Sequence, residues 1–388
     1  MSMSIKKYKT FEIILYILGA YFAHFIINNK LLMYSETILL LFTFFLIITI
    51  IFGYEATNVK LIINSKFTKL YLFICFFYIL RIKGIYSINS ENFYNNNLYM
   101  EIIGLLVYYI VFIAAASLRE DGNFSVKKIY FNFLLWLILF GITAVEFKNN
   151  DIHNMNYYGY ICFIALPLIF IIDNQRVVTK FCLILLITAS SVYFQSRLVV
   201  AACMIFLFTK YVYPKIHKED KAGSIYIIIL IVILIFISMY VILKNSSYYP
   251  MLEELSLNLT GKGLFGRAEI WNELLLKVKN KLLLGYCSSC SSESIFSEKI
   301  QRNLSSHNSW LEFLFRGGII FYLIIVCAIY SLYEVNKSKI IYAMILSMCI
   351  LMTGYEFLFF STMVPNTLIW ITLGLVINSS TKNNLTKP

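Results

Sequence analysis

The sequence predicts an all-α, polytopic integral membrane protein with about 12 transmembrane helices and one large extracytoplasmic loop that contains an amphipathic helix. Hydrophobic residues make up 60% of the 388 residues and charged residues only 14%, whereas soluble domains are usually about a quarter charged. Apolar runs long enough to cross a bilayer, about 20 residues as a helix, recur along the whole chain. These runs are continuous, and lipid-facing barrel strands would instead alternate apolar and polar residues, so the spans are helices.

The predicted spans begin with an apolar run that lacks a small-residue cleavage site, so we expect it to be a retained first helix rather than a signal peptide. The third and sixth spans are short for a membrane crossing. In chain order, the predicted spans are 11–27, 36–54, 67–80, 98–117, 129–146, 157–172, 177–194, 197–213, 224–243, 318–333, 339–356 and 363–378.

The chain divides into three parts. Residues 1–243 form an N-terminal transmembrane bundle of about nine spans, and residues 318–388 form about three further spans and a short cytoplasmic tail. Residues 244–317 form the extracytoplasmic loop between them. We expect the polar tail from Asn378 to Pro388 to be loose.

The distribution of positive charge predicts the orientation. Most lysines and arginines of the short loops fall on one set of alternating loops, which the positive-inside rule assigns to the cytoplasm. Both termini are therefore predicted to be cytoplasmic, in a multi-pass membrane protein. The net charge of +12 largely reflects this bias, and we expect no nucleic-acid partner.

The outer loop contains the stretch "GRAEIWNELLLKVKNKLLLG", from Gly266 to Gly285, which has the pattern of an amphipathic helix. Its apolar residues fall within one arc of about 140° on a helical wheel: Ile270, Trp271, Leu274, Leu275, Val278 and Leu282. Arg267 projects near the centre of this arc, in the first turn, where the helix dipole disfavours a cation. It either meets an anion, or it lies before the first true turn and simply extends its charge to water.

The stretch "SSHNSWLEFLFRGG", residues 305–318, follows a serine-rich loop. We expect Ser305 or Ser306 to cap a helix that runs into the tenth span, with Gly317 and Gly318 at the membrane entry. His307 lies at the start of this helix. A histidine accepts a proton near neutral pH, although a lone one is also common as a polar loop residue.

Other polar residues predicted near the outer surface are candidates of the same kind. Arg197 lies in a tight outer turn, where it suits a phosphate or is an ordinary interfacial arginine. Asn154 and Asn156 in "DIHNMNYYGY" either bind sugar hydroxyls or end a helix. His24 and His153 are alternative bases, and Glu146 and Glu356 near outer span ends need a partner or solvent.

The motifs of several enzyme classes are missing. The chain has no P-loop, no HExxH and no GxSxG, and no acidic pair lies in the first outer loop to hold a metal. We therefore predict no metal and no cofactor. Cys287 and Cys290 form a single CxxC in the outer loop; two free thiols are the preferred interpretation, ahead of a local disulfide or a zinc site.

The order of "SR" at Ser196-Arg197, "GRAEIW" at 266–271 and "HNSWLEFLFRGG" at 307–318 resembles the O-antigen ligase/polymerase superfamily, which includes the Wzy-type polymerases of polysaccharide repeat units. The resemblance covers the whole hydropathy profile. It implies that Arg197 and Arg267 bind the diphosphate of an undecaprenyl-diphosphate-linked glycan, and that His307 assists the attacking sugar hydroxyl. Asn308, Asn154 and Asn156 join the substrate-binding set, although Met155 replaces a proline found in some members.

The function expected from this resemblance is polymerisation of lipid-linked repeat units into a capsular or O-antigen-type polysaccharide outside the membrane. The motifs do not separate a polymerase from a ligase that moves finished glycan to another acceptor. A flippase or transporter of similar span number is a third interpretation, but transporters place polar groups near the bilayer midplane. Expected partners are the lipid-linked glycan, membrane lipid and, for a polymerase, a chain-length regulator and a flippase.

Overall fold

The structure is a computed structural model that describes part of the chain. Other residues are outside it, and among them are the predicted spans 11–27, 36–54, 129–146 and 224–243. The described residues are 56–80, 98–117, 163–164, 166–167, 169–170, 184–185, 187, 197–211, 254, 268–286, 292, 296–297, 302–303, 308–335, 338–353 and 364–385.

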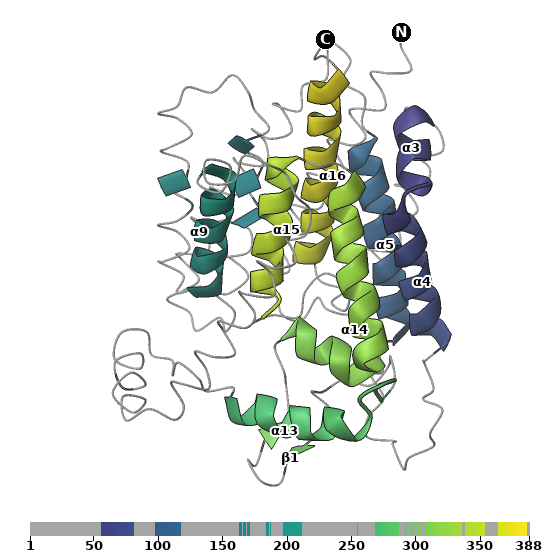
Figure 1. The fold of residues 1–388 in the computed structure, drawn as a ribbon, viewed down its shortest axis with the longest axis vertical. Helices are drawn as coiled ribbons and strands as arrows, with labels where there is room; N and C mark the ends of the chain where they lie inside the picture. Colours follow the sequence, from purple (N-terminus) through teal and green to yellow (C-terminus); the bar gives the residue numbers. More distant parts are fainter. Residues whose placement is uncertain are drawn as a thin grey trace, which may run out of the picture.

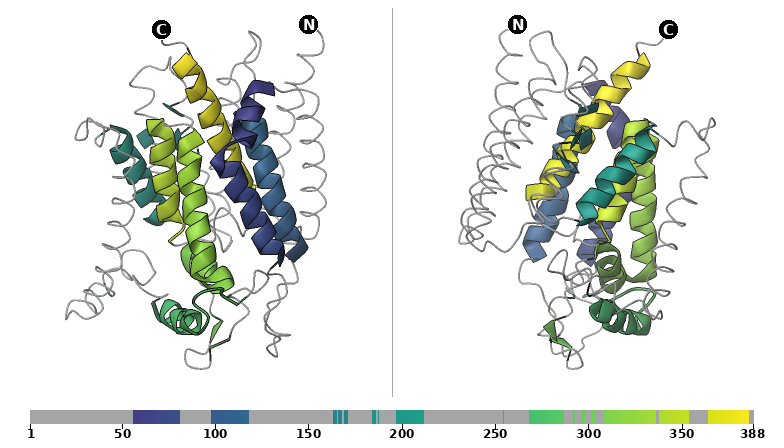
Figure 2. Two further views of the ribbon diagram at one scale, coloured as in Figure 1. Left: turned by 45° about the vertical axis from the view of Figure 1, so that its right-hand side comes forward. Right: turned by 90° about the vertical axis from the view of Figure 1, so that its left-hand side faces the viewer.

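The described residues form an upright bundle of helices with one helix lying across its end (Figure 1). Within the bundle, α16 packs on α5, α15 on α9 and α14 on α4. Helix α13 lies at the same end of the bundle in both views of Figure 2, and we call this the α13 end. The helices are α3 (Ala56–Ile63), α4 (Lys66–Leu80), α5 (Leu98–Ala116), α9 (Arg197–Tyr211), α13 (Ala268–Asn280), α14 (Ser309–Val335), α15 (Lys339–Leu351) and α16 (Val364–Leu385).

This architecture agrees with an all-α membrane protein. Helices α4, α5, α9, α14, α15 and α16 coincide with predicted spans. Within the part of the chain that the structure describes, one helix, α14, is long and apolar enough to cross a membrane, and four shorter helical segments are also apolar. The spans predicted outside these residues remain predictions.

Three details differ from the sequence-based expectation. Helix α16 continues to Leu385, so the expectation of a loose tail from Asn378 is wrong for these residues; Asn, Ser, Thr and Lys each cost a growing helix only tenths of a kcal/mol, about 0.3–0.7. Helix α3 occupies a predicted cytoplasmic loop. In the serine-rich loop, the two-residue strands β1 (Phe296–Ser297) and β2 (Arg302–Asn303) pair antiparallel.

The core of the bundle is built on aromatic rings from α4, α5 and α16. Trp370 is almost fully buried, and its ring lies 5.7 Å from those of Tyr71 and Phe112. Helices α5 and α16 approach closely at Gly374, where a Cβ atom would lie 2.6 Å from the carbonyl oxygen of Phe112. The aromatic rings thus fill one side of α16, and a glycine allows the neighbouring backbone to touch it.

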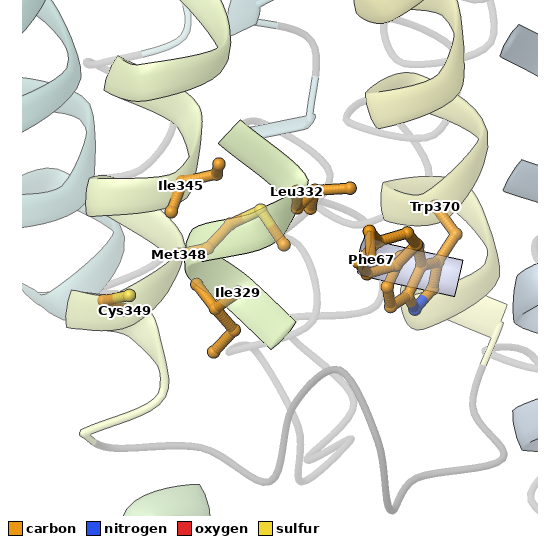
Figure 3. A pocket seen from close by; sticks show the side chains of 7 residues that line it. All are labelled: Phe67, Ile329, Leu332, Ile345, Met348, Cys349 and Trp370. Carbon is orange, nitrogen blue, oxygen red and sulfur yellow. The ribbon is translucent and has the colours of Figure 1, made fainter. Parts of the chain in front are cut away.

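A small cavity lies inside this core. Its lining comes from four helices and is apolar: Phe67, Ile329, Leu332, Ile345, Met348, Cys349 and Trp370 (Figure 3). A site for sugars or phosphates needs convergent polar groups, so this cavity does not have the character of a substrate site. The polar side chains that do converge lie at the α13 end.

Candidate functional site at the α13 end of the bundle

Helix α13 is amphipathic, as its sequence predicts, and its apolar face packs on the first half of α14. Ile270, Leu274 and Val278 recur at four-residue spacing and are buried against Phe315. Leu274 is fully buried. The helical wheel placed Leu275 and Leu282 in the apolar arc, but their side chains are 45% and 47% exposed, so this part of the prediction is wrong. Leu275 lies at the edge of the arc, and Leu282 follows the last residue of the helix, so the wheel no longer applies to it.

Two glycines join the end of α13 to a kink in α14. Gly318 lies inside α14 with φ of 66°, and Gly285 follows α13 with φ of 63°; only glycine adopts such angles readily. The two backbones touch, because a Cβ atom on Gly285 would lie 2.5 Å from the amide nitrogen of Gly318. The glycines that bracket both sequence motifs therefore form one junction, which we call the glycine junction.

Backbone hydrogen bonds close this junction. The kink removes amide groups of α14 from their helical partners, and the turn after α13 replaces them. The N–H of Ile319 donates to the carbonyl of Leu282 at 2.7 Å, and the N–H of Tyr286 donates to the carbonyl of Phe315 at 2.8 Å. The kink is stable because the protein itself satisfies these backbone groups.

Helix α13 and the first half of α14 run in the same direction. Both end at the glycine junction, and Leu311 and Leu314 of α14 pack beside the buried face of α13. The starts of the two helices therefore lie on the same side of the junction. Arg267 directly precedes α13 and His307 precedes Asn308, the residue before α14.

Asn308 caps the start of α14. Its Oδ1 accepts hydrogen bonds from the N–H of Trp310 at 3.0 Å and of Leu311 at 3.2 Å. The expectation that Ser305 or Ser306 caps this helix is wrong, because α14 begins only at Ser309. An asparagine is as good an N-cap as a serine, and here it is the polar residue next to the first turn. From the sequence, Asn308 was instead predicted to bind substrate.

The start of α14 is also fixed to the end of α15. The N–H of Ser309 donates to the carbonyl of Met352 at 2.9 Å, and the indole Nε1 of Trp310 donates to the carbonyl of Cys349 at 3.1 Å. The first amides of α14 are thus used inside the protein. An anion next to this helix start would therefore be held by side chains rather than by these N–H groups.

Replacing Asn308 by alanine should lower the free energy of unfolding by about 0.5–2 kcal/mol, the usual cost of losing an N-cap. Asn308→Asp keeps an oxygen acceptor and should retain most of this stability. Thermal unfolding of the purified variants in detergent measures the difference. An aspartate variant as unstable as the alanine variant would contradict the capping role.

The first half of α14 carries a buried polar network centred on Glu312 and Arg316. Glu312 is fully buried and Arg316 is 3% exposed, and the Nε of Arg316 lies 2.8 Å from the Oε1 of Glu312. Glu312 also accepts hydrogen bonds from Ser292, through the hydroxyl at 2.6 Å and the backbone N–H at 3.2 Å. Arg316 donates to the hydroxyl of Tyr78 at 2.8 Å. The network therefore links the outer loop, α14 and α4.

The sequence reading did not single out this network. A signal was present, because Glu312 and Arg316 stand four residues apart in an otherwise apolar motif, which places them on one helix face. Their partners are far away in the chain, with Tyr78 on α4 and Ser292 in the serine-rich loop. Only the fold brings these together.

Tyr286 packs against the last turn of α13. Its ring stacks on Phe315 with centroids 4.7 Å apart, and its hydroxyl donates to the carbonyl of Lys277 at 3.2 Å. Burial raises the pKa of the Tyr286 phenol above its usual value, so the hydroxyl stays protonated and keeps donating at neutral pH. The last turn of α13 is held in this way.

The structure tests the predicted site residues only in part. Arg197 is the first residue of α9, and α9 packs on α15, the helix whose end holds the start of α14. The side chain of Arg197 lies outside the described residues, as do Arg267, His307, Asn154, Asn156, His24, His153, Glu146, Glu356, Cys287 and Cys290. Their roles in the site remain predictions.

Comparison with known proteins gives one match. Residues 161–326 match the family model described as O-antigen ligase, a range that includes α9, α13 and most of α14. A search of curated proteins and a search of solved structures found no match. The matched range contains the helices that carry the sequence motifs, and the match supports the O-antigen ligase/polymerase superfamily.

Proposed function

We propose that the protein polymerises undecaprenyl-diphosphate-linked oligosaccharide repeat units at the extracytoplasmic face of a bacterial plasma membrane, with both termini in the cytoplasm. The product would be a capsular or O-antigen-type polysaccharide. The match to the O-antigen ligase family model supports a membrane protein that acts on lipid-linked glycan as a ligase or polymerase. The polymerase activity, the repeat unit and the orientation are our proposal.

The observation that carries the proposal is the shared direction of α13 and the first half of α14. Because both helices end at the glycine junction, their starts lie on one side of it. Arg267 and His307 immediately precede those starts in the sequence, although forty residues of chain separate them. A cationic group and a proton acceptor are therefore expected to face one substrate.

The proposed reaction is a single displacement. An acceptor sugar hydroxyl attacks the anomeric carbon of the donor, the bond from that carbon to the diphosphate oxygen breaks, and His307 accepts the hydroxyl proton. Arg197 and Arg267 bind the departing diphosphate through bidentate charge-assisted hydrogen bonds. A positioned base contributes about 10²–10⁴-fold, and holding donor and acceptor together contributes a further proximity effect. The anomeric configuration would invert.

In this proposal Asn154 and Asn156 contact sugar hydroxyls, and Asn308 holds the start of α14 as its cap. The buried network of Ser292, Glu312, Arg316 and Tyr78 supports the start of α14 from behind, so that His307 keeps its position relative to α13. A chain-length regulator and a flippase that delivers the substrate are the partners such a polymerase needs.

A ligase is the second candidate, because the matching family model is described as O-antigen ligase. Ligation would use the same leaving group and the same arginines, with a different acceptor. The two functions differ in their products: a polymerase makes a ladder of chain lengths from single repeat units, and a ligase transfers a finished chain.

The test is an assay of the purified protein in vesicles with a defined lipid-linked repeat unit, with and without a chelator of divalent metals. We expect a ladder of lipid-linked products in both conditions and without an ion gradient. Transfer of preformed polymer to a second acceptor, with no ladder, would replace the polymerase by the ligase. Translocation of the substrate without new glycosidic bonds would contradict both.

A further inference from the structure

An exposed aliphatic surface lies at the glycine junction. The turn after α13 contributes three consecutive leucines, and the first turn of α14 after the kink contributes three more residues. Backbone hydrogen bonds from Ile319 to Leu282 and from Ile320 to Leu283 hold the two segments together. All six side chains are exposed, Leu283 to 66%. This junction patch consists of Leu282, Leu283, Leu284, Ile319, Ile320 and Leu323.

The depth of the patch follows from the length of α14. Residues 318–335 rise about 27 Å at 1.5 Å per residue, which nearly equals the hydrocarbon thickness of about 30 Å. At the far end of this segment, Glu334 forms an exposed ion pair with Lys66 at 3.7 Å, which fits the opposite membrane surface. Ile319 and Leu323 are therefore at the edge of the hydrocarbon, and the leucine turn lies beside them.

Charges on the same segment fit this depth. Lys279 is exposed at the end of α13, and Lys281 lies over the ring of Tyr286 with its Nζ 4.7 Å from the centroid. Lysines next to an exposed aliphatic surface are typical of segments that lie in the membrane interface, where the chains enter the acyl boundary and the ammonium groups meet lipid phosphates.

We propose that Leu282, Leu283 and Leu284 form an interfacial anchor that inserts into the outer edge of the lipid bilayer, with Lys279 and Lys281 at the headgroup phosphates. The occupant is membrane lipid, because the patch continues directly into the lipid-facing side of the α14 span. The anchor fixes the end of α13 at the membrane surface. The anchor therefore fixes the distance between α13 and the membrane surface, and with it the position of Arg267 at the start of that helix.

The test places a photoreactive benzophenone amino acid at Leu283 or at Leu276, one variant at a time, in otherwise unchanged protein. Leu276 is the matched control: it is a leucine of α13 with 57% exposure, and on the wheel it lies opposite the buried face. The variants are reconstituted in vesicles of phosphatidylglycerol and phosphatidylethanolamine without any lipid-linked sugar, and irradiated. Mass spectrometry then counts phospholipid adducts.

We expect several-fold more phospholipid adducts at Leu283 than at Leu276. Equal yields at the two positions would overturn the proposal, as would cross-links from Leu283 to a second copy of the chain. Adducts that form only after lipid-linked oligosaccharide is added would assign the patch to the substrate's polyprenyl chain instead. If the Leu283 variant is not recovered folded, the same measurement at Leu282, which is also exposed, decides. The readout requires no enzymatic activity, so it is independent of the proposed polymerase function.

Discussion

Replacing Arg267 by alanine is expected to lower the rate of glycan lengthening by about 10²–10³-fold, the usual cost of removing one preorganised donor to a developing negative charge. The diphosphate leaves with its charge exposed unless guanidinium groups neutralise it, because the proposed site contains no metal. The protein itself should stay folded in the membrane. The buried contacts of α13 come from Ile270, Leu274 and Val278, which the substitution leaves in place.

The measurement compares initial rates of ladder formation at saturating lipid-linked substrate for the wild type, Arg267→Ala and Arg267→Lys. A lysine keeps the charge and loses the bidentate geometry, so its rate should fall between the other two. Lys69→Ala is the charge-matched control, because it removes one cation from the exposed surface of α4 and should leave the rate unchanged. Full-length polymer from Arg267→Ala at the wild-type rate would refute the assignment.

The features that could be predicted from the sequence are those that depend on local pattern. Continuous apolar runs gave the positions of α5 and α15 closely, and the four-residue spacing of Ile270, Leu274 and Val278 gave the buried face of α13. The paired glycines marked the predicted membrane entry of the tenth span, and the structure places the kink of α14 at the second of them. Each of these signals lies within a few turns of chain.

The features that could not be predicted depend on contacts between distant segments. The pairing of Gly285 with Gly318 requires that α13 fold back on α14, and no local signal fixes that return. The choice of Asn308 as the cap depends on where the first turn meets the end of α15. Tyr78 looks like an ordinary aromatic residue of a span until Arg316 is placed beside it.

Replacing Arg316 by leucine is expected to lower the free energy of unfolding by about 3–5 kcal/mol, the cost of leaving one member of a buried ion pair without the other. The carboxylate of Glu312 is fully buried and would lose its cationic partner while it keeps its hydrogen bonds from Ser292. The hydroxyl of Tyr78 would lose the charged donor that it now accepts from. A loss of this size is a large part of the stability of an ordinary domain.

The matched control is the exposed ion pair between Lys66 of α4 and Glu334 of α14. The two side chains are 3.7 Å apart but 78% and 32% exposed, so Lys66→Ala should cost about 0–1 kcal/mol. The same two helices are thus joined by this exposed ion pair and by the buried hydrogen bond from Arg316 to Tyr78. Comparing Arg316→Leu with Lys66→Ala separates the effect of burial from the effect of joining α4 to α14.

The double variant Glu312→Leu with Arg316→Leu completes the experiment. It removes both buried charges together, so it should be more stable than Arg316→Leu alone, although Ser292 and Tyr78 still lose their partners at about 1–3 kcal/mol each. Denaturant unfolding of the three variants in lipid-detergent micelles gives the free energies of unfolding to be compared. A cost for Arg316→Leu no larger than for Lys66→Ala would show that the network does not hold α14 against α4. The start of α14 would then be fixed by the contacts of Ser309 and Trp310 with the end of α15, and the support proposed for His307 would have to come from there.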